Sequence, residues 1–328
     1  MRLFATCPPS SAHPDGYRER VAEVARWSER AGCEGILVYT DNSLLDPWLV
    51  AQLVLDATET LAPLVAIQPV YMHPYAVAKM VASLARLYGR PVHLNLVSGG
   101  FRNDLLALGD STPHDRRYER LTEYATIVQG LLAGGPVTLE GAFYRVERLK
   151  LAPAPPPELR GDVFVSGSSA AGLGAARALG ALAVRYPRPA AEEVGFPGGD
   201  VRTGLRLGIV ARDEDEAAWR AAAERFPADR RGQLTHQLAM KVSDSVWHRQ
   251  LSELAGRTNG SPYWLFPFEN YKTMCPYLVG SYRRVGEELG RYLELGARTF
   301  ILDVPPDEEE LGHVVAAFEA ATLERAAS

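Results

Sequence analysis

Short apolar runs alternate with longer amphipathic segments along most of the chain. Each run is apolar at consecutive positions, which is typical of parallel β-strands buried on both faces. The longer segments carry apolar residues at helical spacing, as in residues 15–31, where Gly32 ends the pattern. The runs predict eight strands, at residues 3–7, 35–40, 64–70, 92–97, 163–166, 181–186, 205–211 and 299–304.

Eight strands, each followed by a helix or a helix-sized segment, predict an α/β fold of the TIM (β/α)8 barrel class. We expect one domain over residues 1–328. The main alternative is a doubly wound open sheet, which has fewer strands and a glycine-rich turn after the first. Here the first strand runs into Pro8-Pro9-Ser10-Ser11, which is not such a turn.

One long segment, residues 227–294, interrupts the alternation between strands seven and eight. It holds helical pieces and the aromatic run Tyr263-Trp264-Leu265-Phe266-Pro267-Phe268. An insertion in a loop that follows a barrel strand lies over the catalytic mouth. We therefore expect a lid, a subunit contact, or both, and we expect Trp264 to contact substrate. A smaller excursion, residues 136–151, reads as a hairpin that turns at Gly141.

The composition argues against nucleic-acid-binding, disulfide-rich, metal-binding and membrane proteins. Of the 328 residues 47% are hydrophobic, and the net charge of -5 does not favour nucleic acid or an anionic membrane surface. Cys7, Cys33 and Cys275 are too scattered for a disulfide framework or a thiolate metal site, so we expect reduced thiols. The histidines lack zinc-ligand spacing, and no metal is expected. With no signal-peptide pattern and no apolar run of ~20 residues, we expect a soluble cytoplasmic protein.

In a barrel of this kind the chemistry sits at the carboxyl ends of the strands. Arg206 on strand seven is the leading candidate for a catalytic residue, because a guanidinium near the barrel interior needs an anion or a full set of acceptors. The alternative is a structural ion pair. The same rule selects further polar side chains at strand ends, namely Thr40, Asp41, Gln68, Asn95, Ser98 and Tyr186.

The strand-to-helix turn at residues 165–170 carries Gly167, Ser168 and Ser169. A helix N-terminus offers free N–H groups and partial positive charge, so this turn is a candidate phosphate cradle. The alternative is an ordinary serine N-cap. The nearby run 172–177 begins like a dinucleotide fingerprint, but its last glycine is missing and it lies inside a predicted helix.

Three longer runs carry a family resemblance. His73-Pro74-Tyr75-Ala76-Val77-Ala78-Lys79-Met80, residues 92–100 (VHLNLVSGG) and residues 114–120 (HDRRYER) resemble the bacterial luciferase-like flavin monooxygenases. Within that family the chain is most similar to the alkanesulfonate monooxygenase branch, through residues 46–51, 167–169 and 204–207. The resemblance covers residues 1–225 well and 295–325 weakly, and the insertion 227–294 matches poorly.

The resemblance implies an FMN-dependent monooxygenase that oxidises a small organic substrate with reduced FMN and O2, in specialised or sulfonate-type metabolism. A separate NAD(P)H-dependent flavin reductase would supply the reduced FMN, and we expect a homodimer or homotetramer. Carried over, Gln68 and Asn95 would lie near the isoalloxazine ring. Arg206 would face the substrate or the reacting flavin. The phosphate would be held at Tyr118, Gly167, Ser168 and Ser169.

Three departures from the alkanesulfonate enzymes change the expected substrate. Those enzymes carry a cysteine, a histidine and a tyrosine where this chain has Leu44, Gly208 and Pro305. The loss of three polar groups predicts a larger or less anionic substrate, contacted by Leu44 and Tyr186 as well as Trp264. Two alternatives remain, a deazaflavin-dependent oxidoreductase of the same superfamily and a non-catalytic flavin-binding homologue.

Overall fold

Eight parallel strands form a closed ring in the computed structural model, which describes residues 1–99, 101–193, 195–196, 201–242, 246–254 and 261–327. Each strand pairs in parallel with the next, and the pairing of the first with the last closes the ring. The TIM barrel prediction is confirmed. The ring runs β1 (Arg2–Thr6), β2 (Gly35–Val38), β3 (Ala62–Ile67), β4 (Val92–Val97), β7 (Arg160–Ser166), β8 (Leu182–Arg185), β9 (Thr203–Arg212) and β12 (Thr299–Leu302).

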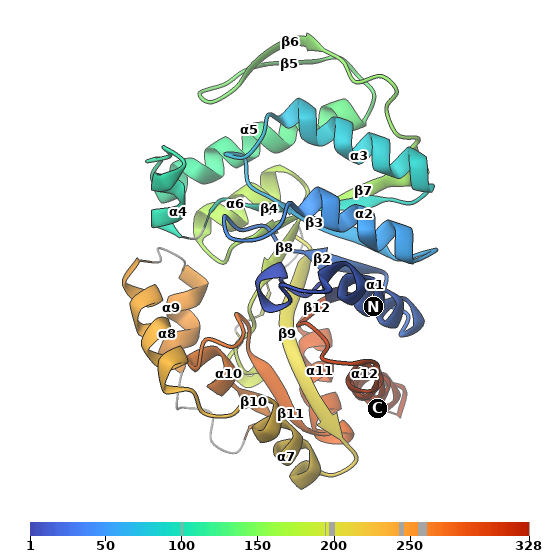
Figure 1. Ribbon diagram of the computed structural model, residues 1–328, viewed down its shortest axis with the longest axis vertical. Helices are drawn as coiled ribbons and strands as arrows, with labels where there is room; N and C mark the ends of the chain where they lie inside the picture. The colour runs from blue at the N-terminus through green and yellow to red at the C-terminus, as the bar shows by residue number, and fades with distance from the viewer. Residues whose placement is uncertain (100, 194, 197–200, 243–245, 255–260, 328) are drawn as a thin grey trace.

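Helices surround this ring (Figure 1). Their starts are specified locally, as at α2, where the Asp46 carboxylate accepts hydrogen bonds from the N–H groups of Trp48 and Leu49. The helices of the outer layer are α1 (Tyr17–Arg30), α2 (Pro47–Ala57), α3 (Pro74–Tyr88), α4 (Arg102–Ala107), α5 (His114–Leu132), α6 (Ala170–Ala178), α7 (Asp215–Arg225), α11 (Tyr282–Glu294) and α12 (Glu308–Ala327). Short 3-10 turns cover Ser10–Ala12, Pro157–Leu159 and Ala190–Glu192.

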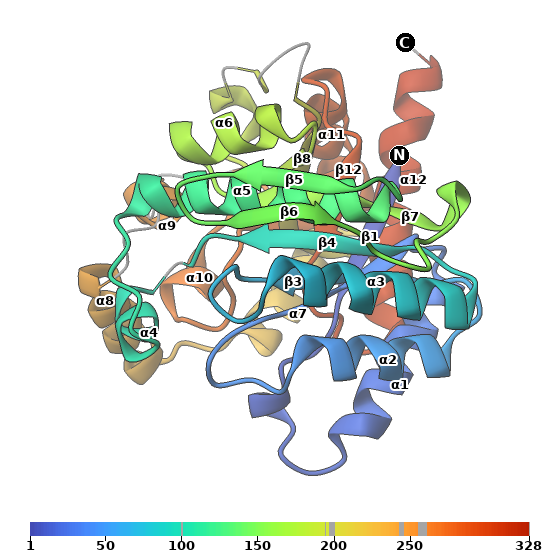
Figure 2. The same ribbon diagram turned by 90° about the horizontal axis from the view of Figure 1, so that it is seen from above.

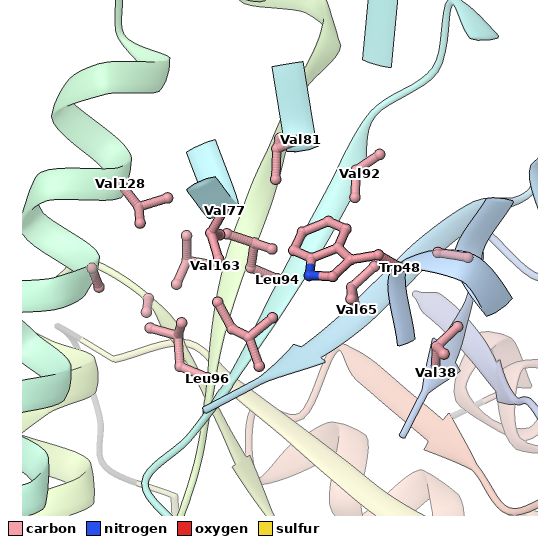
Figure 3. Close-up of a cluster of buried hydrophobic side chains, with 14 of the residues drawn as sticks. Val38, Trp48, Val65, Val77, Val81, Val92, Leu94, Leu96, Val128 and Val163 are labelled. Atoms are coloured by element: carbon pink, nitrogen blue, oxygen red, sulfur yellow. The ribbon is translucent and has the colours of Figure 1, made fainter. Parts of the chain in front are cut away.

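Two apolar layers hold the barrel together. Inside the ring, Phe4, Leu37, Leu64 and Phe164 pack as a buried cluster, so the barrel centre is a core and not a pore. Outside it, side chains of β3, β4 and β7 meet those of α2, α3 and α5, with the Trp48 indole among the labelled valines and leucines (Figure 3). This arrangement explains why the strands are apolar at consecutive positions.

The smaller excursion is a hairpin of β5 (Val137–Glu140) and β6 (Arg145–Leu149), as predicted. The long insertion holds α8 (Arg230–Val242), α9 (Val246–Leu254), β10 (Tyr263–Trp264), α10 (Phe266–Glu269), β11 (Tyr277–Ser281) and then α11. Its last part belongs to the wall, because β11 extends β9 in parallel and Val285, Leu289 and Tyr292 of α11 are buried. The insertion therefore has two parts: β11 and α11 belong to the barrel wall, whereas the preceding helices lie outside it.

The two views place α4, α8 and α9 on one side of the molecule, the side toward which β4 points (Figures 1 and 2). This is the carboxyl end of the barrel strands, where catalytic groups of the fold gather. Among the described residues no helix is long and apolar enough to cross a membrane. The same part of the chain shows no group of three metal-ligating side chains.

Candidate functional site

One cavity at the carboxyl end of the barrel collects most of the predicted site residues. Its lining includes residues from β4, β9, α5 and the turns after β3, β7 and β8. Leu44 lines an adjoining cavity, which shares Thr40, Asp41 and Gln68 with the first. The predicted residues that meet in the first cavity are Gln68, Asn95, Tyr118, Gly167, Ser168, Ser169, Tyr186 and Arg206.

Trp264 lies elsewhere, and the expectation that it contacts substrate from this cavity does not hold. Its ring stacks on Phe266 with centroids 5.6 Å apart and meets Trp219 and Phe226 edge-on. It is absent from the described lining of the cavity. The aromatic run is buried within its own chain, as the Tyr263 hydroxyl shows by donating to the Pro187 carbonyl at 2.7 Å. The run therefore packs largely inside the fold, with Trp264 and Phe266 only partly buried.

The turn between β7 and α6 is shaped by close packing against Tyr118. Gly167 has φ +152°, and a Cβ at this position would lie 2.1 Å from the Tyr118 hydroxyl oxygen. That hydroxyl donates to the Ser166 carbonyl at 3.3 Å. The Ser169 hydroxyl accepts from the Gly172 N–H at 3.1 Å, so it is the N-cap of α6. Ser169 is thus an N-cap that also lines the cavity, and the two interpretations of this turn are compatible.

Amide side chains line the middle of the cavity. The Asn95 side chain, almost fully buried, accepts from the Ser166 hydroxyl at 2.9 Å through its carbonyl oxygen. The Gln68 amide nitrogen donates to the Tyr71 hydroxyl at 3.1 Å, and Tyr71 donates to Asn42 at 2.6 Å. These bonds fix both amides at the ends of adjacent strands, β3 and β4, so that they face one space.

Arg206 lies on the floor of the cavity in a polar network. It donates to the Tyr39 hydroxyl, and its guanidinium carbon lies 4.9 Å from the centre of the Tyr39 ring. An Asp303 oxygen is 4.0 Å from its terminal nitrogen. The other Asp303 oxygen accepts from the hydroxyls of Thr273 at 2.6 Å and Tyr277 at 2.8 Å. The predicted ion pair therefore exists, but it is long.

The electrostatics keep Arg206 charged. Burial lowers the pKa of its guanidinium, yet Tyr39, Tyr186 and Asp303 outweigh this effect and the pKa is raised above its usual range. Its Nε atom is buried and has no hydrogen-bond partner among the described residues. An unused donor on a buried charged group is rare in folded proteins.

Sequence reasoning missed two neighbours of Arg206. Tyr39 immediately precedes the strand-end residues Thr40 and Asp41, and the strand-end rule applied one residue earlier would have found it. Asp303 follows β12 in the same way. Both residues could have been identified from the predicted strand boundaries alone.

The insertion supplies the remaining wall of the cavity through Val246, Trp247, His248 and Met274. Trp247 stacks on Tyr186 with ring centroids 4.1 Å apart and an angle of 20° between planes. Nothing in the local sequence of α9 ties it to the end of β8, because only tertiary packing brings the two together. These residues had no sequence signal that could have identified them.

Gly208 and Pro305 have an explanation in the packing. A Cβ on Gly208 would lie 2.2 Å from the Tyr277 ring, so the insertion fills the space that a side chain at this position would occupy. Tyr277 pairs with Gly208 across β11 and β9. Pro305 lines a small separate cavity together with Gly208 and Tyr277. The polar group absent at position 208 is therefore replaced by packing from the insertion.

The comparisons with known proteins agree with this fold. A family model described as luciferase-like monooxygenase matches residues 1–299. The 4-(gamma-L-glutamylamino)butanoyl-[BtrI acyl-carrier protein] monooxygenase BtrO of Niallia circulans is 33% identical over 320 residues, which cover 93% of each chain.

Solved structures share the barrel at low sequence identity. The EDTA monooxygenase EmoA from Chelativorans sp. BNC1 superposes with a TM-score of 0.73 at 18% identity, covering 98% of this chain and 93% of the other. The coenzyme F420 dependent tetrahydromethanopterin reductase from Methanopyrus kandleri superposes with a TM-score of 0.64 at 13% identity, covering 96% and 97%. At these low sequence identities, the two superpositions show a shared fold.

Proposed function

Because the chain belongs to the luciferase-like monooxygenase family, we propose that it is an FMN-dependent monooxygenase that oxidises a small organic substrate with O2. The observation that carries this proposal is the single cavity at the carboxyl end of the barrel. It joins a phosphate-sized turn at residues 167–169 to a buried guanidinium, Arg206, by way of Gln68 and Asn95.

The described residues fit FMN at both ends. At the turn, a Cβ on Gly167 would fill the space beside the Tyr118 hydroxyl, so only glycine leaves this cradle open. The N-terminus of α6 adds N–H groups and partial positive charge for a phosphate. Gln68 and Asn95 would offer hydrogen bonds to the polar edge of the isoalloxazine ring. Reduced FMN supplies the electrons with which O2 is activated.

The chain's own contribution to the reaction centres on Arg206. Its fixed charge would stabilise negative charge that develops on oxygen during the reaction, at a site that excludes water. Tyr39 holds one guanidinium nitrogen, while the unpartnered Nε remains for the reacting group. Asp303 is a positioning residue, since it orients the guanidinium without lying among the residues that line the cavity.

The relatives favour flavin over deazaflavin. BtrO, the more similar of the relatives described above, is a monooxygenase, whereas the F420-dependent reductase shares only the fold. Deazaflavins carry out hydride transfer and do not activate O2 as reduced flavins do, so a monooxygenase activity favours a flavin over a deazaflavin. The presence of charged Arg206 at the cavity floor argues against a non-catalytic flavin-binding homologue.

We also propose that a separate NAD(P)H-dependent flavin reductase supplies the reduced FMN. Gly172 and Gly174, which resemble the start of a dinucleotide fingerprint, lie inside α6 and not in a turn between strand and helix. They therefore cannot form the close backbone approach that a pyrophosphate needs.

Oxygen labelling tests the proposed function. The protein is incubated with FMN, NADH, a purified flavin reductase and panels of candidate acids, amides, phenols and their thioesters under 18O2. We expect one 18O atom in a product that requires the protein, and loss of that product with Arg206→Ala. Substrate turnover with reduced F420 in the absence of O2 would overturn the proposal.

A further inference from the structure

The wall of the cavity that the insertion contributes differs from the flavin-facing turn. It presents the stacked pair Tyr186 and Trp247 and, beside Trp247 in α9, the imidazole of His248. Trp247 and His248 come from the insertion, where the chain matches the alkanesulfonate branch poorly, and Tyr186 comes from the turn after β8.

His248 is buried without using its hydrogen-bonding capacity. Its side chain is 2% exposed, and neither ring nitrogen has a partner among the described residues. Behind it lie the rings of Phe268 and His236, each with its centroid 5.1 Å from the His248 ring. A buried polar group without a partner is costly and rare in folded proteins, unless a ligand completes it. His248 is also among the residues that line the cavity.

The charge state of His248 selects the partner. Burial, with a smaller contribution from His236, lowers the pKa of the His248 imidazole from 6.5 to about 4. At neutral pH the ring is therefore uncharged, and it offers one donor and one acceptor. An uncharged ring supplies no opposite charge to offset the desolvation of a carboxylate, a sulfonate or an ammonium group, although its nitrogens can form a hydrogen bond with any of them.

The other charged groups of the cavity do not change this selection. Arg206 is the one lysine or arginine in the described lining, and its positive charge, next to Tyr39 and Asp303, disfavours an ammonium ligand. Asp41 and Asp104 line the cavity as well, and burial followed by the charge of Asp41 raises the pKa of Asp104. These carboxylates add to the unfavourable field for an anionic ligand.

We propose that Tyr186, Trp247 and His248 form the substrate subsite, and that it binds an uncharged, planar group with a hydrogen-bond donor and an acceptor, such as an amide or a phenol. The planar group would lie along the aromatic pair while His248 bonds its polar edge. This assignment rests on the proposed function, since it names the substrate class of the same cavity.

The test uses probes of one shape and three charges, and it needs no flavin. Benzamide, benzoate and benzylammonium are titrated into the full-length protein by calorimetry, and the ring-nitrogen NMR signals of the histidines are followed. We expect benzamide to bind at least roughly tenfold more tightly than either ion and to shift the His248 ring signals. Equal or tighter binding of benzoate or benzylammonium would overturn the proposal, as would benzamide binding that leaves the His248 signals unmoved.

Variants separate the hydrogen bond from the aromatic surface. His248→Phe should weaken benzamide about 3- to 10-fold, to the affinity of toluene, and His248→Gln should recover part of it. His13→Gln, far along the chain in the loop after β1, is the matched control and should bind benzamide as the wild type does. Unchanged affinity in His248→Phe would contradict the assignment. Binding of reduced FMN to the wild type is measured separately. Absence of FMN binding would contradict the proposed function, whereas absence of benzamide selectivity would contradict only the proposed substrate subsite.

Discussion

Replacing Gly167 by alanine tests the phosphate cradle with the smallest possible change. The new methyl group would lie 2.1 Å from the Tyr118 hydroxyl oxygen and 3.0 Å from the ring carbon that carries it. Tyr118 is buried in the wall that α5 forms, so the turn or the ring must move. The φ of +152° is also one that residues with a Cβ rarely adopt, at a cost of about 1–3 kcal/mol.

When FMN binds, the Tyr118 hydroxyl would exchange its long bond to the Ser166 carbonyl for one to the phosphate, and displacing the hydroxyl would remove that charge-assisted hydrogen bond, worth about 1.5–3 kcal/mol. We therefore expect Gly167→Ala to weaken reduced FMN roughly 10- to 100-fold in anaerobic titrations, and to weaken riboflavin much less. Gly174→Ala is the matched control, because Gly174 lies in α6, the helix that follows this turn, and its Cβ would meet nothing within 4 Å. Equal loss for FMN and riboflavin, or no loss for either, would refute the cradle.

Three further predictions follow from the same network. Arg206→Ala should fold and bind FMN but lose roughly 10²-fold or more in turnover, the scale of one positioned donor, and Arg206→Lys should not restore it; a lower Tm with an unchanged rate per folded molecule would instead mean a structural ion pair. Gly208→His should destabilise the protein by about 1–3 kcal/mol, seen as a lower Tm, because the Tyr277 ring occupies its space. His93, whose imidazole accepts from the Asp162 N–H at 2.9 Å, has its pKa lowered by burial from 6.5 to about 4. The unfolded state binds the proton first, so stability should fall on the order of 3 kcal/mol as pH drops from 6.5 toward 4; a His93→Gln variant with the same dependence of Tm on pH would exclude this group as the cause.

The barrel could be predicted because its signal is local. Each strand is a short apolar run and each outer helix repeats its apolar positions, so the order of elements alone specifies the closed ring. The strand-end rule then placed Gln68, Asn95 and Arg206 in one cavity, since parallel strands end at the same side.

The insertion could not be predicted in the same way, because its role depends on contacts between distant segments. The run around Trp264 is aromatic whether it covers a cavity or packs inside the fold, and composition does not separate the two. His248 reaches the cavity only because Trp247 stacks on Tyr186. The replacement of a side chain at Gly208 by the Tyr277 ring likewise depends on the register between β9 and β11.

The central claim is that this cavity binds reduced FMN through its phosphate. The most direct measurement is an anaerobic equilibrium titration of the wild-type protein with reduced FMN, reduced riboflavin and reduced F420 under identical conditions. The account predicts that reduced FMN binds at least roughly tenfold more tightly than riboflavin, the worth of one charge-assisted hydrogen bond, and more tightly than F420. Equal affinity for FMN and riboflavin, or a preference for F420, would contradict it.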